Sequence, residues 1–148
     1  MRLLLCAAIV LAACSDATAP LGVKPAYGVV ITMDVPGTCL AGGCDPPGAG
    51  MTLSLIHVVN TGTSTAYLRA CGTYAALTEQ VVQNGAWVNA GPAIDCAVTP
   101  GPIVLAAGDS LRQNWWFASG TRQIVVGVSS KADLSDEALD ASAGVKIK

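Results

Sequence analysis

The sequence predicts an all-β fold, an antiparallel β-sandwich of about seven to nine strands over residues 26–148. Three observations indicate it. Apolar residues alternate with polar ones in many short segments, which is the period of a half-buried strand. Residues that form turns recur at intervals of roughly ten residues, as in sandwiches. No segment has the apolar spacing of a convincing amphipathic helix.

The first predicted strand is Tyr27–Val35, which Pro36 ends. Its apolar face would carry Tyr27, Val29, Ile31, Met33 and Val35. Residues 36–50 follow as a loop rich in Gly and Pro. Loops longer than about 12–15 residues are uncommon in compact domains, so this segment is either a binding feature or a decoration of the fold.

The middle of the chain continues with strands at Met51–Asn60 and Ala66–Cys71. A hairpin is expected around Asn84-Gly85, because this dipeptide between apolar segments is the strongest short hairpin signal. In that hairpin, Val82 would lie opposite Trp87.

The last third contains a short strand at 103–105 and a longer strand at 111–117, which we expect to pair with 122–129. The acidic segment 131–140 would form a loop or one helical turn. Residues 145–148 alternate again and read as an edge strand guarded by lysines.

The N-terminus has the composition of an export signal. Arg2 supplies a positive charge and an apolar run extends from Leu3 to Leu11. This run is too short to span a bilayer, which needs about 20 apolar residues. The stretch Leu11-Ala12-Ala13-Cys14 resembles the lipobox of bacterial lipoproteins, in which Leu and two small residues precede a lipidated Cys. An ordinary secretory signal and a cytosolic protein with an apolar N-terminus are the alternatives.

The lipobox resemblance implies a domain organisation and an address. Residues 1–13 would be a lipoprotein signal peptide, and residues 14–25 a lipidated Cys14 followed by a flexible tether. The partner would then be a membrane of the bacterial cell envelope, because two or more acyl chains anchor a protein stably. Ser15, rather than Asp, follows Cys14, which favours the outer membrane.

Removal of the leader and lipidation of Cys14 would leave four of the six cysteines. An even number in an exported chain indicates disulfides. Four cysteines allow three pairings, of which we favour the local Cys39–Cys44 and Cys71–Cys96. The alternative is a four-cysteine zinc site, but the spacing lacks the CxxC pairs of such sites, so we predict no metal and no cofactor.

Charge and motifs narrow the function classes. The formal net charge is −2 and there is no basic cluster, which disfavours nucleic acid as a partner. His57 is the single histidine, and there is no Gly-x-Ser-x-Gly motif, so no catalytic residues are predicted. A hydrolase built on His57 is the least favoured alternative. A half-buried histidine bonded to the backbone is the ordinary explanation.

The aromatic residues suggest a binding surface. Trp115 and Trp116 are adjacent, so on a strand they point to opposite faces, and one of them would belong to the core. The other could join Trp87 and Tyr67 in a surface that stacks on sugars or contacts a partner protein. The alternative is a tryptophan covered by a loop.

The order of these elements resembles the immunoglobulin-like domains of bacterial envelope proteins. A more particular likeness is to the second half of the bacterial intracellular proteinase inhibitor domain, and it rests on Leu105, Gly108-Asp109-Ser110, Trp115-Trp116, Gly120 and Ile124-Val125-Val126. Ala107 stands where that family has Pro, and no Tyr follows Gly120, so inhibition is not carried over.

From these observations we expect a non-enzymatic envelope lipoprotein whose sandwich acts in structure or in interaction with another envelope protein. A glycan- or peptide-binding module that uses an exposed tryptophan is the second reading.

Overall fold

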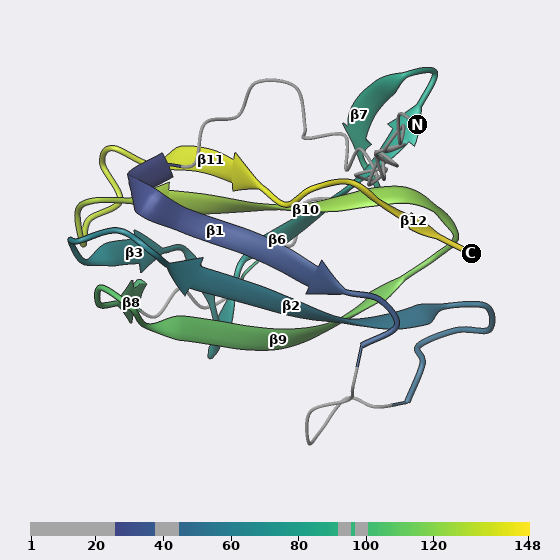
Figure 1. The fold of residues 1–148 in the computed structure, drawn as a ribbon, viewed down its shortest axis with the longest axis horizontal. Helices are drawn as coiled ribbons and strands as arrows, with labels where there is room; N and C mark the ends of the chain where they lie inside the picture. The colour runs from purple at the N-terminus through teal and green to yellow at the C-terminus, as the bar shows by residue number, and fades with distance from the viewer. Residues whose placement is uncertain (1–25, 38–44, 92–95, 97–100) are drawn as a thin grey trace, which may run out of the picture.

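The computed structural model describes residues 26–37, 45–91, 96 and 101–148. Within them the chain forms two main antiparallel sheets packed face to face and a small two-stranded sheet, which confirms the predicted all-β sandwich (Figure 1). The predictions for residues 1–25 and for Cys39–Cys44 lie outside the described residues. The strands are β1 (Val29–Asp34), β2 (Thr52–Asn60), β3 (Ala66–Leu68), β4 (Ala70–Cys71), β5 (Tyr74–Ala75), β6 (Leu77–Gln83), β7 (Ala86–Asn89), β8 (Ile103–Leu105), β9 (Ser110–Phe117), β10 (Gly120–Ser129), β11 (Ala138–Ala141) and β12 (Val145–Ile147).

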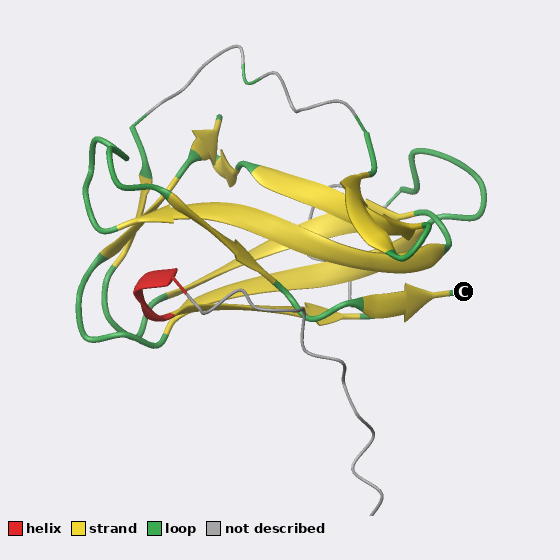
Figure 2. Cartoon of the chain, turned by 90° about the horizontal axis from the view of Figure 1, so that it is seen from above, coloured by secondary structure: helices red, strands yellow, loops and turns green. Residues whose placement is uncertain are grey.

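The first sheet has three strands in the order β1-β2-β9. Its central strand, β2, pairs with β1 from Leu55 to Asn60 and with β9 from Thr52 to Val59, and neither register is interrupted. One helical turn, η1 (Ala26–Gly28), precedes β1 (Figure 2). Strands β1 and β9 are therefore the two edge strands of this sheet.

The second sheet has seven strands and is organised around β10. Strands β3 and β6 pair with successive segments of one edge of β10, while β11 and β12 pair with the other edge. Strand β8 extends the sheet beyond β3, and β7 extends it beyond β6. The hairpin register places Val82 opposite Trp87, as the Asn84-Gly85 turn predicts.

The division of strands between the sheets follows the immunoglobulin-like order. Strands β1, β2 and β9 occupy the positions of A, B and E. In the facing sheet, β3 with β6 takes the position of C, β10 that of F, and β11 with β12 that of G. Chain connections therefore cross between the sheets several times, as in other sandwiches of this class.

The core lies between the inner faces of the two sheets. The alternation of β1 places Val29 and Ile31 inward, and that of β10 places Ile124, Val126 and Val128 inward. The largest side chain with no exposed surface is Phe117 at the end of β9. Burial of these alternating apolar residues is the main stabilising term, at about 25 cal/mol per Å² of apolar surface.

Three sequence predictions are wrong in detail. Strands β9 and β10 do not form a hairpin, because each pairs within a different sheet. Gly120, with φ of 125°, turns the chain from one sheet to the other, and a short link between apolar segments looks the same in sequence for either connection. The predicted strand Ala66–Cys71 is divided into β3 and β4, and the end of segment 131–140 belongs to β11.

The break after β3 carries a disulfide. Strands β4 and β5 form a small hairpin that leaves the main sheet, and Ala76 N donates to Arg69 O where the chain returns. Cys71 on this hairpin is bonded to Cys96, with a Cα–Cα distance of 5.2 Å, and this is the pairing that the sequence favours. The disulfide joins the β4–β5 hairpin to the long connection that precedes β8.

A carboxylic acid is buried in the core beside β10. Asp140 of β11 lies opposite the inward-facing Val126 and is 3% exposed. Its Oδ1 accepts a hydrogen bond from Ala141 N at 2.8 Å, whereas its buried Oδ2 has no partner in the described part of the chain. Desolvation raises the pKa of Asp140, because burial disfavours the charged carboxylate.

We expect that replacing both Cys71 and Cys96 by Ser lowers the free energy of unfolding by about 3 kcal/mol, since the bond closes a loop with a sequence separation of 25. Urea denaturation of the oxidised wild type and the double variant measures this difference. Mass spectrometry of non-reduced peptides provides the independent check. Free thiols at both positions in the native protein would contradict the assignment.

We expect the pH dependence of stability to reveal Asp140. Its pKa is raised in the folded state, so the native protein binds this proton more tightly than the unfolded chain, and the contribution of Asp140 to stability falls as pH rises above the ordinary value of 3.8. Asp140→Asn should therefore be more stable than wild type at neutral pH, and the difference should shrink below pH 3.8. Thermal unfolding from acid to neutral pH tests this, with the exposed Asp45→Asn as control. The assignment would be refuted if the stability of the wild type increased relative to that of Asp140→Asn as pH rises.

Candidate functional site

Three segments meet at the end of the sandwich where β1 begins, which is the left end in Figure 1. They are η1, the loop 61–65 between β2 and β3, and the segment 130–137 between β10 and β11. In immunoglobulin-like terms the two connections are the B–C and F–G loops, which cluster at one end of the fold. At this end the three segments contribute to one surface.

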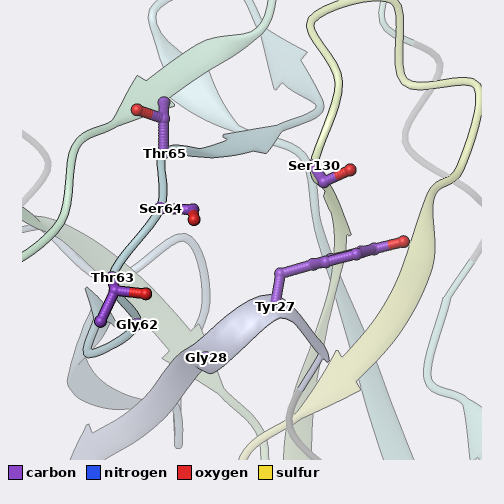
Figure 3. Close-up of a pocket in the computed structure, with 7 residues that line it drawn as sticks. All are labelled: Tyr27, Gly28, Gly62, Thr63, Ser64, Thr65 and Ser130. Atoms are coloured by element: carbon purple, nitrogen blue, oxygen red, sulfur yellow. The ribbon is translucent and has the colours of Figure 1, made fainter.

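A pocket of about 330 Å³ lies between these segments. It is lined by Tyr27, Gly28, Gly62, Thr63, Ser64, Thr65 and Ser130. Figure 3 shows the side chain of Tyr27 extending toward Ser130, while Thr63 and Ser64 stand on the opposite wall with their hydroxyl oxygens turned toward it. None of the lining residues carries a charge.

Two glycines allow η1 to approach the loop 61–65. A Cβ on Gly28 would lie 2.7 Å from Gly62 Cα, a distance that real Cβ atoms do not reach. Gly28 O accepts hydrogen bonds from Thr61 N at 2.9 Å and from Thr61 Oγ1 at 2.6 Å. This close backbone contact forms the floor of the pocket.

Tyr27 occupies an unusual backbone conformation. Its φ of 55° lies in the left-handed region, which costs a residue with a Cβ about 1 kcal/mol. The phenol donates a hydrogen bond of 2.7 Å to Asp136 O across the end of the sandwich. Desolvation and the nearby Asp136 carboxylate raise the pKa of Tyr27, so the phenol remains protonated as a donor at neutral pH. The hydrogen bond to Asp136 O holds the ring over the pocket despite this backbone strain.

Asn60 holds the loop 61–65 in place from beneath. Its side chain is fully buried, and Nδ2 donates to Ser64 O at 2.8 Å and to Leu105 O at 2.9 Å. Its Oδ1 accepts from Gly62 N at 3.0 Å. One amide thus satisfies two backbone groups of the loop 61–65 and one at the end of β8, which holds the pocket wall in place.

Asp136 organises the opposite wall. It accepts hydrogen bonds from the hydroxyls of Ser129 and Ser130, and from Ser130 N at 3.2 Å. Bonds from Ser129 first, then from Ser130, hold the pKa of Asp136 down at about 2, because each favours the charged carboxylate. A negative charge therefore stands directly behind Ser130 at neutral pH.

Trp115 is the core tryptophan of the predicted pair. It lies opposite the buried Ser54 and packs against the core. Its Nε1 donates to Glu79 Oε2 at 3.2 Å, and Glu79 Oε1 pairs with Arg122 Nη1 at 2.7 Å. The side chains of Glu79 and Arg122 are only 17% and 12% exposed, so this group closes the interior between the sheets.

The other predicted aromatic residues are not brought together. Trp116 is half-buried on the outer face of the three-stranded sheet, opposite Leu53. Tyr67 of β3 and Trp87 of β7 lie on the outer face of the seven-stranded sheet. Figure 1 shows these two strands at opposite ends of that sheet. Tyr67 pairs with Ser129, whereas the Trp87 ring reaches Gly144 beside Thr121, about 26 Å away along β10. The geometry does not form one stacking surface from these residues.

His57 lies on the outer face of the three-stranded sheet and is 20% exposed. Its Nε2 is 3.0 Å from Asp34 Oδ2, a side-chain partner rather than the backbone partner expected from the sequence. Its cross-strand neighbours are Thr32 and Arg112. A Ser–His–Asp arrangement needs a serine hydroxyl within hydrogen-bond reach of the ring, and neither of these two neighbours is a serine.

The residues that build the pocket were missed by sequence reasoning, except that Tyr27 was assigned to a strand face. Short Ser/Thr loops occur in most chains, so Thr63, Ser64 and Ser130 carry no specific signal. Asn60 is the residue from which part of the site could have been predicted, because a polar side chain at an inward strand position needs hydrogen-bond partners. Among the described residues no cluster of His, Cys, Asp and Glu could hold a metal ion. No helix in that part of the chain is long and apolar enough to span a membrane.

We expect Asp136→Asn to destabilise the protein at neutral pH, because the amide is a weaker acceptor for the two serines. The folded-state pKa of about 2 lies below the ordinary 3.8, so the stabilisation is present above pH 3.8 and is lost as pH falls toward 2. Urea unfolding of both proteins at several pH values measures this. Asp45→Asn, at an exposed position, is the control. Equal stability of wild type and Asp136→Asn at pH 7 would count against the assignment.

No model of a known protein family and no curated protein matches this chain. The function of the site therefore has to be inferred from its own geometry and chemistry.

Proposed function

We propose that this chain is a lipid-anchored protein of the bacterial cell envelope whose β-sandwich acts in structure or in protein interaction, without catalysis. The observation that carries the proposal is Leu11-Ala12-Ala13-Cys14 directly after an apolar run of export-signal length. Lipidation of Cys14 would attach the chain to a membrane, and residues 15–25 would hold the sandwich off its surface. At about 3.3–3.6 Å per residue, this tether reaches at most some 35–40 Å.

The folded part supports this reading in two ways. The Cys71–Cys96 disulfide fits an oxidising compartment outside the cytoplasm. The immunoglobulin-like order of strands gathers loops at one end, and in sandwiches of this kind such loops contact partners. Both features suit a domain displayed from a membrane surface.

The second reading, a glycan- or peptide-binding module that uses an exposed tryptophan, has less support. Trp87, Trp115 and Trp116 are all half-buried and belong to different faces of the sandwich. The hydrolase reading is also weaker, because His57 sits beside Asp34 on an open sheet face and not in the pocket. A recognition role would therefore use a different surface from the tryptophans.

We expect Cys14→Ser to release the protein from the membrane fraction of a bacterial host, since no acyl chain can then be attached. Metabolic labelling with a fatty-acid analogue should mark the wild type and not the variant. Cys6→Ser is the matched control: it changes a cysteine of the leader that the proposal assigns no role, so it should still be labelled and remain with the membrane.

Fractionation of inner and outer membranes tests the address. Wild type should band with the outer membrane, and Ser15→Asp should shift toward the inner membrane. An unlabelled wild type, or a Cys14→Ser variant that still sediments with membranes, would overturn the anchoring proposal.

A further inference from the structure

The pocket at the loop end has an unusual chemical character. Five of its lining residues carry hydroxyl groups, namely Tyr27, Thr63, Ser64, Thr65 and Ser130, and the other two are glycines. Its volume of about 330 Å³ lies at the small end of the range for pockets that hold small molecules, about 300–1,000 Å³. The pocket offers one aromatic face and a wall of neutral hydrogen-bonding groups.

The hydrogen-bonding capacity of one wall is unused. Tyr27 Oη and Ser130 Oγ are engaged with Asp136. Within the described part of the chain, the hydroxyls of Thr63 and Ser64 make no hydrogen bond, and Figure 3 shows them turned toward the cavity. Each hydroxyl can donate once and accept twice, so this wall can serve a ligand that both donates and accepts.

The geometry is held before any ligand arrives. Asn60 fixes the backbone of the loop 61–65, and the contact between Gly28 and Gly62 fixes the floor. Tyr27 is held in a strained conformation and is 40% exposed as a residue, although large apolar side chains are normally covered. A rigid site with an exposed ring lowers the entropic cost of binding.

The charges around the pocket select against ions. Asp136 stands behind Ser130 as a carboxylate, which disfavours an anionic ligand. The lining offers no carboxylate or other charged group to a cation. The occupant that fits is therefore neutral and rich in hydroxyl groups.

We propose that this pocket binds one neutral saccharide unit. A pyranose ring has an apolar C–H face and a rim of hydroxyl groups, which match the Tyr27 ring and the Thr63–Ser64 wall respectively. The site lies away from Trp87, Trp115 and Trp116, so it differs from a tryptophan surface. The inference goes beyond the proposed role in structure or protein interaction, and it does not depend on the lipid on Cys14.

The test is a titration of the ¹⁵N-labelled full chain in detergent, followed by amide chemical shifts. Glucose, galactose and N-acetylglucosamine are the neutral probes, added to about 10 mM, which detects dissociation constants near 1 mM. Glucuronate is the anionic comparison. We expect shifts confined to residues 27–29, 61–65 and 129–130 with at least one neutral sugar, and weaker shifts with glucuronate.

Two variants separate the ring from the hydroxyls. Tyr27→Gly removes the aromatic face, and Gly accepts the positive φ at this position without strain, so the fold should persist. Thr63→Val removes a hydroxyl while keeping the shape of the side chain. We expect Tyr27→Gly to weaken binding at least tenfold, and Thr63→Val to weaken it about three- to tenfold, the effect of one lost hydrogen bond. Tyr74→Ala, at a residue of the β4–β5 hairpin that is 63% exposed, should leave binding unchanged.

The outcomes are distinct. No localised shift with any of the three sugars, equal binding of glucuronate, or unchanged binding by Tyr27→Gly would each overturn the inference. Vesicles that carry a neutral glycolipid form a second arm, and binding there with Tyr27 dependence supports the same site on a lipid-borne sugar. A negative result in these experiments does not affect the lipidation proposal, which the labelling of Cys14 tests separately. Likewise, absence of label on Cys14 does not affect the saccharide proposal.

Discussion

The sandwich depends on the pairing of β10 along both of its edges. One edge holds β3 and β6, and the other holds β11 and β12, so four strands take their register from this single strand. A shift of β10 by one residue would turn Ile124, Val126 and Val128 away from the core. Because every alternate residue on this strand is committed to the interior, its register and that of its neighbours are set by the same hydrophobic constraint.

This constraint extends from the core to the pocket. Strand β10 ends at Ser129, so its register places Ser130 and, through it, Asp136 at the end of the sandwich. Strand β2 ends at Asn60, whose amide places the loop 61–65 on the other side. Strand β1 begins directly after Tyr27 and Gly28. The pocket is the space that remains when these strand ends are held at fixed positions.

Two ion pairs link segments of the sandwich that are distant in sequence. Charged residues make up 12% of the chain, well below the average of about 25%. Glu137, which precedes β11, lies across Gly127 of β10 and pairs with Arg69 beyond it, and a Cβ at Gly127 would lie 1.8 Å from its Oε1. Glu79 and Arg122 link β6 to β10 in the interior. Because the two partners of each ion pair lie far apart in the sequence, these pairs could not be predicted before the fold was known.

The local features of this protein were determined by the sequence alone. Alternating residues defined most strands, the Asn84-Gly85 turn set the β6–β7 register, and the pattern implied a sandwich, because these signals arise between near neighbours. The assignment of β9 and β10 to different sheets, the inward side of Trp115, and the meeting of Tyr27, the loop 61–65 and Ser130 were decided by tertiary structure. Each depends on contacts between residues far apart along the chain, and such contacts exist only once both sheets have closed around their common core.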